Sequence, residues 1–263
     1  MSDTTHNLAD VFDSHAPSDK TAHFHDLLRL REQAWMLVNE NLDLREDLAC
    51  QDIRDIPALD GQIVGNIHTY TGRSSPVDWL IRSWIGRPVT GFTNIHLTCW
   101  LNSSVDVPHL GFALGTAPDV FFYCDLLPRY ELMVQPQHLD QYYEPLNQLW
   151  VDLRRERSVT LFNPVNAYIR STISPVALLG LVPYAVFKEK VEGAILHYVR
   201  YWVDLVKNAQ PAPPETRAAL AARDLTMRRT IVERDPANLL ADRMVGVPLR
   251  ERLVRILWGG ERE

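Results

Sequence analysis

Residues Thr90–Leu101, TGFTNIHLTCWL, carry the alternation that decides the fold. Every second position is apolar, at Ile95, Leu97, Cys99 and Leu101. The positions between them are polar, at Asn94, His96 and Thr98. Successive side chains of a β-strand point to opposite faces, so this strand has an apolar core face and a polar face. Runs rich in β-branched and aromatic residues predict neighbouring antiparallel strands at Gln62–Tyr70, Leu110–Thr116 and Val120–Leu126.

Helical periodicity precedes and follows the predicted strands. Apolar residues recur at steps of three and four from Thr21 to about Leu48, across His138–Arg155 and across Phe187–Asn208. Residues 1–20 are polar and predict a disordered leader. The order of helix, strands and helices predicts an α/β sandwich domain over residues 21–209.

The proline-rich segment Gln210–Pro214, QPAPP, cannot continue a helix and predicts a stiff boundary. Helical segments are predicted after it at Glu215–Glu233, Pro236–Met244 and Pro248–Trp258. The last carries an apolar stripe that needs a partner. Residues 210–263 are therefore predicted to be a linker and a helical C-terminal appendage, docked on the sandwich or on the second subunit of a homodimer.

Composition and charge exclude several classes of protein. The chain has 263 residues, of which 46% are hydrophobic and 23% charged, as in a folded globular protein. Its net charge of −6 disfavours nucleic acid as a partner. The longest apolar stretch, Ser174–Phe187, contains two prolines and falls short of the roughly 20 residues of a membrane helix. It predicts a buried segment and no association with a membrane.

The cysteines and the missing motifs narrow the chemistry. Cys50, Cys99 and Cys124 are widely spaced, which indicates neither a disulfide framework nor a thiolate metal site. With an N-terminus that lacks the pattern of a signal peptide, they predict a reducing, cytoplasmic location. No phosphate loop, dinucleotide-binding glycine motif, hydrolase motif or zinc motif is present. The sequence therefore predicts no bound metal and no nucleotide cofactor.

Four blocks of sequence carry a family resemblance: Ser74–Gly86 (SSPVDWLIRSWIG), Leu101–His109 (LNSSVDVPH), Asp125–Glu144 (DLLPRYELMVQPQHLDQYYE) and Tyr168–Pro175 (YIRSTISP). In this order they resemble red chlorophyll catabolite reductase, and the likeness runs from about Ser74 to Asp204. Pro108–Leu114 (PHLGFAL) is similar to a motif of the wider group, the ferredoxin-dependent bilin reductases. The resemblance implies an antiparallel sheet sandwiched between helices.

The resemblance also implies an activity. Enzymes of this kind are oxidoreductases that pass single electrons from ferredoxin to an open-chain tetrapyrrole or a related conjugated pyrrolic substrate. They carry no tightly bound cofactor, and the protein supplies the protons. The acid of the proline–glycine motif falls on Ala113, so the expected proton donor is missing. His96 matches a catalytic histidine of one branch. Glu189 aligns approximately with a second carboxylate, although a shift of the alignment would put Glu192 there instead. The resemblance predicts His96 and Glu189 to be catalytic.

Six residues are predicted to contact the substrate: Asn102, Asp106, His109, Ala113, Tyr168 and Arg170. Asn102 and Asp106 could instead cap backbone groups of a turn, and His109 could be a structural histidine. Tyr168 could stack on the substrate, and Arg170 could pair with a propionate.

Other polar and aromatic residues of these blocks are predicted to be structural. Asp125 and Arg129 are predicted to form an ion pair at the end of the sheet. The aromatic cluster is predicted to belong mostly to the core, at Trp79, Trp84, Trp100, Phe121, Phe122 and Tyr123.

Ala113 leaves two further functions open. The chain could be a member of the family recruited to specialised metabolism, acting on another aromatic or pyrrole-like small molecule. It could also be a non-catalytic tetrapyrrole-binding protein that kept the pocket and lost the acid. Docking of ferredoxin would need a basic patch, which could come from Arg154, Arg155 and Arg157 or from Arg228 and Arg229.

Overall fold

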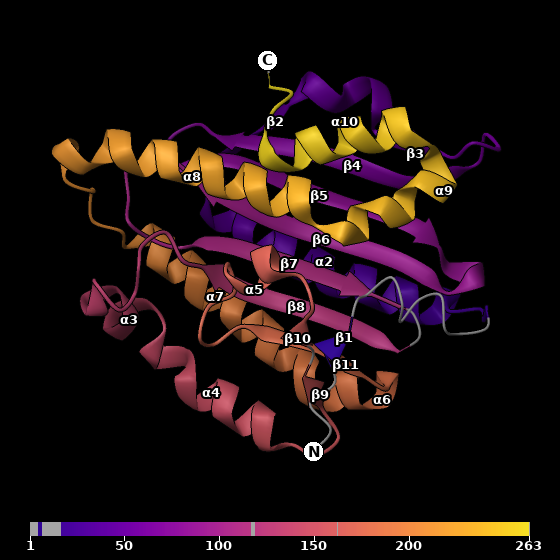
Figure 1. The fold of residues 1–263 in the computed structure, drawn as a ribbon, viewed down its shortest axis with the longest axis horizontal. Coiled ribbons are helices and arrows are strands. Elements are labelled where there is room, and N and C mark those ends of the chain that lie inside the picture. Colours follow the sequence, from indigo (N-terminus) through magenta and orange to yellow (C-terminus); the bar gives the residue numbers. More distant parts are fainter. Residues whose placement is uncertain (1–4, 7–16, 117–118, 162, 263) are drawn as a thin grey trace.

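A computed structural model describes residues 5–6, 17–116, 119–161 and 163–262. Within these residues nine strands form one antiparallel sheet, in the order β2–β4–β5–β6–β7–β8–β11–β9 with β3 beside β4 (Figure 1). The strands are β2 (Leu44–Asp47), β3 (Asp55–Pro57), β4 (Ile63–Gly72), β5 (Val77–Arg87), β6 (Phe92–Leu101), β7 (His109–Gly115), β8 (Val120–Leu127), β9 (Thr160–Leu161) and β11 (Leu178–Val182). A separate parallel pair joins β1 (Thr5–His6) to β10 (Asn163–Pro164).

Helices cover both faces of the sheet. They are α2 (Thr21–Asn41), α3 (Pro136–Tyr142), α4 (Glu144–Arg155), α5 (Ala167–Arg170), α6 (Tyr184–Val186), α7 (Glu192–Lys207), α8 (Pro214–Arg234), α9 (Asp242–Val245) and α10 (Val247–Trp258). The 3₁₀ segments are η1 (Leu48–Ile53), η2 (Pro88–Thr90) and η4 (Pro236–Ala241), and η3 (Phe187–Val191) is a π-helical turn that leads into α7.

The larger core lies between one face of the sheet and the helices α2 and α7. The apolar positions of β6 point into it, so the predicted alternation of this strand is confirmed, with Ile95, Leu97 and Cys99 fully buried. On the opposite face, α8 and α10 lie across the central strands (Figure 1). The fold is therefore the predicted helix–sheet–helix sandwich.

The predicted helical C-terminal region is present, and it docks on the sandwich of its own chain, which is one of the two predicted alternatives. The indole of Trp79 donates a hydrogen bond to the carbonyl of Ile256 at 2.7 Å, and that of Trp100 to the carbonyl of Leu257 at 2.9 Å. Both tryptophans belong to the sheet, and both carbonyls belong to α10. The apolar stripe predicted for this helix is thus packed on the sheet of its own chain.

Several predicted boundaries differ from the structure. The first helix ends at Asn41, because the chain turns there into β2. The apolar stretch Ser174–Phe187, predicted only to be a buried segment, contains the strand β11. The sequence does not reveal this strand, because a strand that is covered on both faces lacks the alternation of apolar and polar residues. The helix predicted across residues 138–155 is two helices that meet at Tyr143. Of the predicted leader, residues 1–4 and 7–16 lie outside the described residues.

The described residues bear on two further predictions. All three cysteines are free thiols and are buried. No helix in the described part of the chain is both long enough and apolar enough to cross a membrane.

Candidate active site

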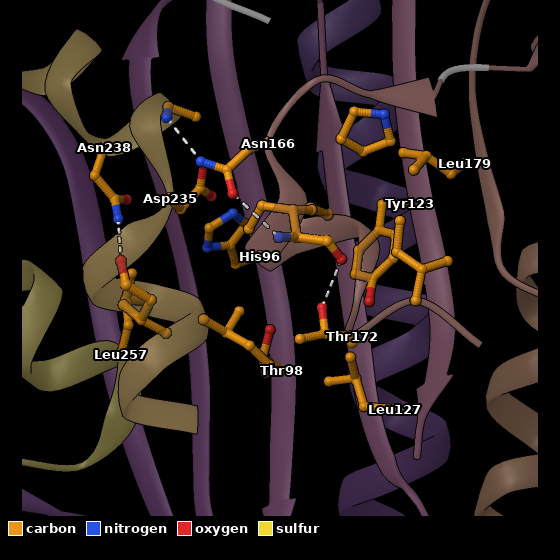
Figure 2. A pocket seen from close by; sticks show the side chains of 18 of the residues that line it. His96, Thr98, Tyr123, Leu127, Asn166, Thr172, Leu179, Asp235, Asn238 and Leu257 are labelled. Atoms are coloured by element: carbon orange, nitrogen blue, oxygen red, sulfur yellow. Dashed lines mark hydrogen bonds between the residues drawn. The ribbon is translucent and has the colours of Figure 1, made fainter. Parts of the chain in front are cut away.

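A cavity of about 450 Å³ lies between the polar face of the sheet and the C-terminal helices. Strands β6, β7 and β8 supply its floor, while α5, α8 and η4 supply the walls (Figure 2). Its polar lining consists of Asn94, His96, Thr98, Tyr123, Asn166, Thr172, Asp235 and Asn238. Much of the remainder is apolar or aromatic, including Trp100, Phe121, Leu127, Ile169, Leu179 and Ile231. Cavities of 300–1,000 Å³ with mainly apolar walls and a few polar groups are typical of small-molecule sites.

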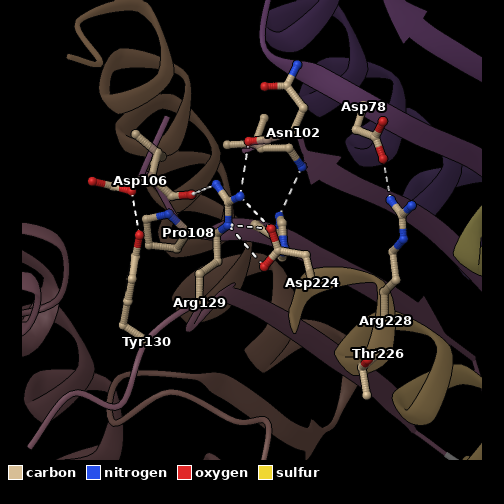
Figure 3. Close-up of polar contacts among 12 residues, drawn as sticks. Asp78, Asn102, Asp106, Pro108, Arg129, Tyr130, Asp224, Thr226 and Arg228 are labelled. Carbon is tan, nitrogen blue, oxygen red and sulfur yellow. Dashed lines mark hydrogen bonds and ion pairs between the residues drawn. The ribbon is translucent and has the colours of Figure 1, made fainter. Parts of the chain in front are cut away.

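A buried ion pair attaches α8, one of the cavity walls, to the sheet (Figure 3). Arg129, at the end of β8, is 1% exposed and donates from Nε to the carboxylate of Asp224 in α8 at 3.1 Å. Its Nη1 donates to the carbonyls of Val105 at 2.7 Å and Val107 at 3.1 Å, and its Nη2 to that of Asn102 at 3.0 Å. One guanidinium thus joins a strand end, the β6–β7 loop and the wall helix.

A second ion-pair group holds the same helix to the sheet further along. Asp78 in β5 pairs with Arg228 in α8 and with Arg262 near the end of the chain. These two guanidinium groups hydrogen-bond the carboxylate and hold its pKa at about 2, although its burial acts in the opposite direction. The wall of the cavity is therefore fixed by charges at two points.

Sheet register brings His96 and Ala113 together on the cavity floor. His96 of β6 is paired with Ala113 of β7, which is paired in turn with Tyr123 of β8. Directly paired residues on one face of a sheet have Cβ atoms about 4.5–5.5 Å apart. The position that would hold the acid of the family motif thus lies between an imidazole and a phenol.

The imidazole of His96 is neutral near pH 7. Burial lowers its pKa to about 4, and the positive charge of Arg31 in α2, on the other side of the sheet, adds to this effect. Among the described residues no hydrogen bond acts on its pKa, and the ring lines the cavity. His96 therefore presents free donor and acceptor groups to a ligand, as Figure 2 shows from the side of the cavity.

Asp235 is the carboxyl of the cavity wall. It lies between α8 and η4, and its Oδ1 accepts a hydrogen bond from the backbone N–H of Ala237 at 2.9 Å. Burial raises the pKa of this carboxyl above its ordinary value, against the effect of that hydrogen bond. A carboxyl whose proton is held to higher pH beside a ligand cavity is suited to general-acid catalysis.

The structure corrects the placement of Glu189. This residue belongs to the π-helical turn before α7, its side chain is 70% exposed and it pairs with Lys190 at 3.0 Å. It does not line the cavity. The approximate alignment pointed to the wrong face of the sheet, because α7 packs on the side opposite the cavity.

Three predicted contacts from the β6–β7 connection are structural instead. Asn102 accepts from the backbone N–H of Ser104, and Asp106 accepts from the hydroxyl of Tyr130 at 2.6 Å. His109 is fully buried: its Nδ1 accepts from the backbone N–H of Leu101 at 2.9 Å, and its Nε2 lies 3.4 Å from Asp224. None of the three lines the cavity, because the connection lies at the end of the sheet, around Arg129.

Tyr168 and Arg170 also point away from the cavity. The ring of Tyr168 is 47% exposed and stacks under the guanidinium of Arg234, and Arg170 donates to the carbonyls of Pro164 and Val165. Ile169, the residue between them on α5, lines the cavity instead, because successive residues of a helix point in different directions. The block was located correctly, but its contacting residues were not.

One structural prediction for the sheet is wrong as well. Asp125 does not pair with Arg129; it accepts from the backbone N–H of Ser174 at 2.9 Å and from the hydroxyl of the same residue. In the aromatic cluster predicted to be mostly core, Trp79, Trp100 and Phe122 are buried, whereas Phe121 and Tyr123 line the cavity, which Trp100 also borders. Tyr123 alternates with the buried Phe122 and Cys124 in β8.

Asp235 was missed in the sequence for a different reason. It falls in the gap between two predicted helices, where an Asp–Pro pair is an ordinary capping signal. Only the docking of α8 on the sheet turns this cap toward His96.

The described residues that line the cavity include no lysine or arginine. The described part of the chain also holds no cluster of three or more His, Cys, Asp or Glu side chains suited to a metal ion.

The fold and its cavity define an α/β/α sandwich with a ligand site between the sheet and the C-terminal helices. Phytochromobilin synthase from tomato, solved in complex with biliverdin, has a similar fold: its TM-score is 0.76, with 15% identity, over 88% of this chain and 82% of that one. Residues 37–257 match the family Red chlorophyll catabolite reductase (RCC reductase). The chain belongs to this family, as the four sequence blocks predict.

Named relatives agree with this assignment. The chloroplastic red chlorophyll catabolite reductase of Arabidopsis thaliana is 25% identical over 225 residues, which span 78% of this chain and 70% of that protein. The chloroplastic red chlorophyll catabolite reductase 1 of Oryza sativa subsp. japonica is 28% identical over 214 residues, which span 74% of this chain and 64% of that protein.

Proposed function

We propose that this protein is an oxidoreductase that reduces an open-chain tetrapyrrole, with Asp235 as its principal proton donor. Membership of the red chlorophyll catabolite reductase family supports the class of reaction. The observation that carries the assignment of the donor is the cavity itself, in which Asp235 is the one carboxyl among the described residues that line it. It replaces the acid that Ala113 cannot supply.

The cavity favours an extended conjugated ligand that lies flat on the sheet. Its floor is the row of side chains from His96 to Tyr123, and aromatic rings of Trp100 and Phe121 border that floor. A flat apolar ring system gains burial there, while His96 can exchange hydrogen bonds with pyrrole nitrogens or lactam oxygens. Carboxylate side chains of the ligand would extend toward solvent, since the lining offers them no cation.

The reaction needs electrons from outside the chain, and we propose ferredoxin as their source. Each electron makes the substrate more basic, so a positioned acid is what the protein has to add. The basic side chains of Arg154, Arg155 and Arg157 are exposed and could dock an acidic partner. Arg228 could not, because it is buried against Asp78.

Three further predictions stay open to test. No tightly bound cofactor is expected, and a homodimer remains a prediction that sedimentation can check. A cytoplasmic location also remains a prediction, since the relatives from Arabidopsis and rice are named chloroplastic. Fractionation of the source cells would test it.

The deciding experiment compares the unaltered protein with Asp235→Asn. Anaerobic assays with reduced ferredoxin would follow the absorbance of biliverdin and of red chlorophyll catabolite. Asparagine keeps the hydrogen-bond acceptor for Ala237 but has no acidic proton, so the turn survives and catalysis does not. A loss of about 10²- to 10⁴-fold in turnover, with unchanged binding, is expected from removal of a general acid.

Each outcome has a distinct meaning. Full activity of Asp235→Asn would contradict the role of Asp235 and leave the reductase assignment standing. Tight binding of both pigments without reduction by the unaltered protein would favour the non-catalytic binding protein. Neither binding nor reduction would favour a recruited enzyme with another pyrrole-like or aromatic substrate.

A further inference from the structure

Beside Ala113 the cavity floor carries a phenol with a carboxyl next to it on the same strand face. Tyr123 lines the cavity directly opposite Ala113. Asp125 follows two positions later in β8, so its side chain leaves the strand on the same face. It is fully buried beneath the segment that includes Ser174. Neither group has a role in the mechanism derived above.

The small size of Gly111 directs the phenol toward this carboxyl. An added Cβ at Gly111 would lie 2.8 Å from Cε1 of Tyr123 and 3.0 Å from its hydroxyl oxygen. Gly111 is paired with Asp125 in the β7–β8 register. The ring of Tyr123 therefore leans along the sheet from its own row into the row of Asp125, and the phenol and the carboxyl each influence the pKa of the other.

Asp125 is not neutralised by a cation. Its hydrogen-bond partners are the backbone N–H of Ser174 at 2.9 Å and the hydroxyl of Ser174, and the phenol of Tyr123 influences its pKa. Arg129, four residues later, is taken up by Asp224 and three backbone carbonyls. A buried carboxyl without a cationic partner is stabilised in its protonated form.

We propose that Tyr123 and Asp125 form a second proton-donating pair, which serves the part of the substrate above Ala113. This inference rests on the proposed function. A substrate atom gains one electron from reduced ferredoxin, and the O–H bond of Tyr123 breaks as a bond from that atom to the proton forms. The carboxyl of Asp125 then transfers its own proton to the phenolate oxygen. Water returns a proton to the carboxylate between turnovers.

The charge state of the pair gives it a characteristic pH dependence. Burial raises the pKa of Asp125 to about 6, so its carboxyl holds a proton below that pH and loses it as the pH rises. The other titratable groups on which its charge acts are Tyr123 on the same face of the strand and Cys124, Tyr143 and Tyr198 in the core behind it, and burial raises the pKa of each. These four stay neutral near pH 6, so they do not titrate in the same range.

The test measures single turnovers of bound biliverdin with reduced ferredoxin from pH 5 to pH 8. Tyr123→Phe keeps the ring and removes the proton, so we expect biliverdin to bind unchanged and turnover to fall about 100-fold, within the range of a general acid. Asp125→Asn should abolish the decline in rate that the unaltered protein shows above pH 6. Tyr198→Phe is the matched control: its buried hydroxyl donates to the carbonyl of Val176, away from the cavity, and turnover should be retained.

The outcomes separate this inference from the function on which it rests. If the unaltered protein reduces neither biliverdin nor red chlorophyll catabolite, the proposed function fails and the inference fails with it. If reduction proceeds and Tyr123→Phe matches the unaltered rate, only the inference is overturned. Persistence of the decline above pH 6 in a folded Asp125→Asn protein, checked by circular dichroism, would likewise overturn it.

Discussion

Removal of the carboxylate of Asp224 should weaken both the fold and the site. In Asp224→Ala the guanidinium of Arg129 stays buried, with its three carbonyl acceptors, but without a counter-charge. Leaving one partner of a buried ion pair uncompensated costs about 3–5 kcal/mol. Whole domains are stable by only about 5–15 kcal/mol, so the loss is a large share of the total.

Urea unfolding at pH 7, followed by tryptophan fluorescence and far-UV circular dichroism, measures this loss. Glu233→Ala is the matched control on the same helix, because it breaks the exposed pair with Arg229, whose side chain is 59% exposed. Surface pairs of this kind contribute about 0.3–0.5 kcal/mol. Titration of biliverdin into the folded variant should also show weaker binding, since α8 forms a wall of the cavity.

A loss below about 1 kcal/mol in Asp224→Ala would refute this reasoning, because that is the range of a surface pair. The double variant Arg129→Met, Asp224→Leu removes both charges and should recover part of the stability. Recovery should be incomplete, since the carbonyls of Asn102, Val105 and Val107 lose their donor. Full recovery would show that these three hydrogen bonds contribute little.

Three further predictions concern the floor of the cavity. Ala113→Asp places a carboxyl between His96 and Tyr123. We expect this variant to reduce biliverdin at least about tenfold faster than the unaltered protein. NMR titration should show the pKa of His96 above its value of about 4, because the new carboxylate favours the protonated imidazole. An unchanged rate and an unchanged titration would argue against that geometry. Gly111→Ala forces the ring of Tyr123 out of its place, so turnover should fall while the melting temperature changes little, because the ring can move into the cavity. A crystal structure with Tyr123 unmoved would contradict this. Finally, burial lowers the pKa of His96 from its ordinary value of 6.5, so the folded state binds this proton more weakly than the unfolded state does. The contribution of neutral His96 to stability is therefore intact above pH 6.5 and is lost as the pH falls toward 4. The free energy of unfolding should fall over that range by about 3 kcal/mol at most. His96→Gln should flatten the pH dependence of urea unfolding over that range, and identical pH curves for the two proteins would exclude the effect.

The sequence by itself determined four strands of the sheet, the class of fold and the position of His96, but not the central strand β5. The alternation across Thr90–Leu101 is local information, since the side-chain period of a strand is set by the backbone. This alternation placed Ile95 on the core face and His96 on the polar face of the strand, without information about any neighbouring strand or helix. The four blocks and the proline–glycine motif likewise identified the family and showed that Ala113 lacks the acid.

Only the tertiary structure decided what stands opposite that face. Asp235 reaches the cavity because Trp79 and Trp100 hold α10, and Arg129 holds α8, against the sheet. Glu189 belongs to the other helical layer, and no local pattern states which face a helix covers. The pairing of Ala113 with Tyr123 is also a long-range fact, because strand register depends on contacts between separate segments of the chain. A sequence motif fixes which residue types a site has, whereas packing fixes which of them face the same cavity.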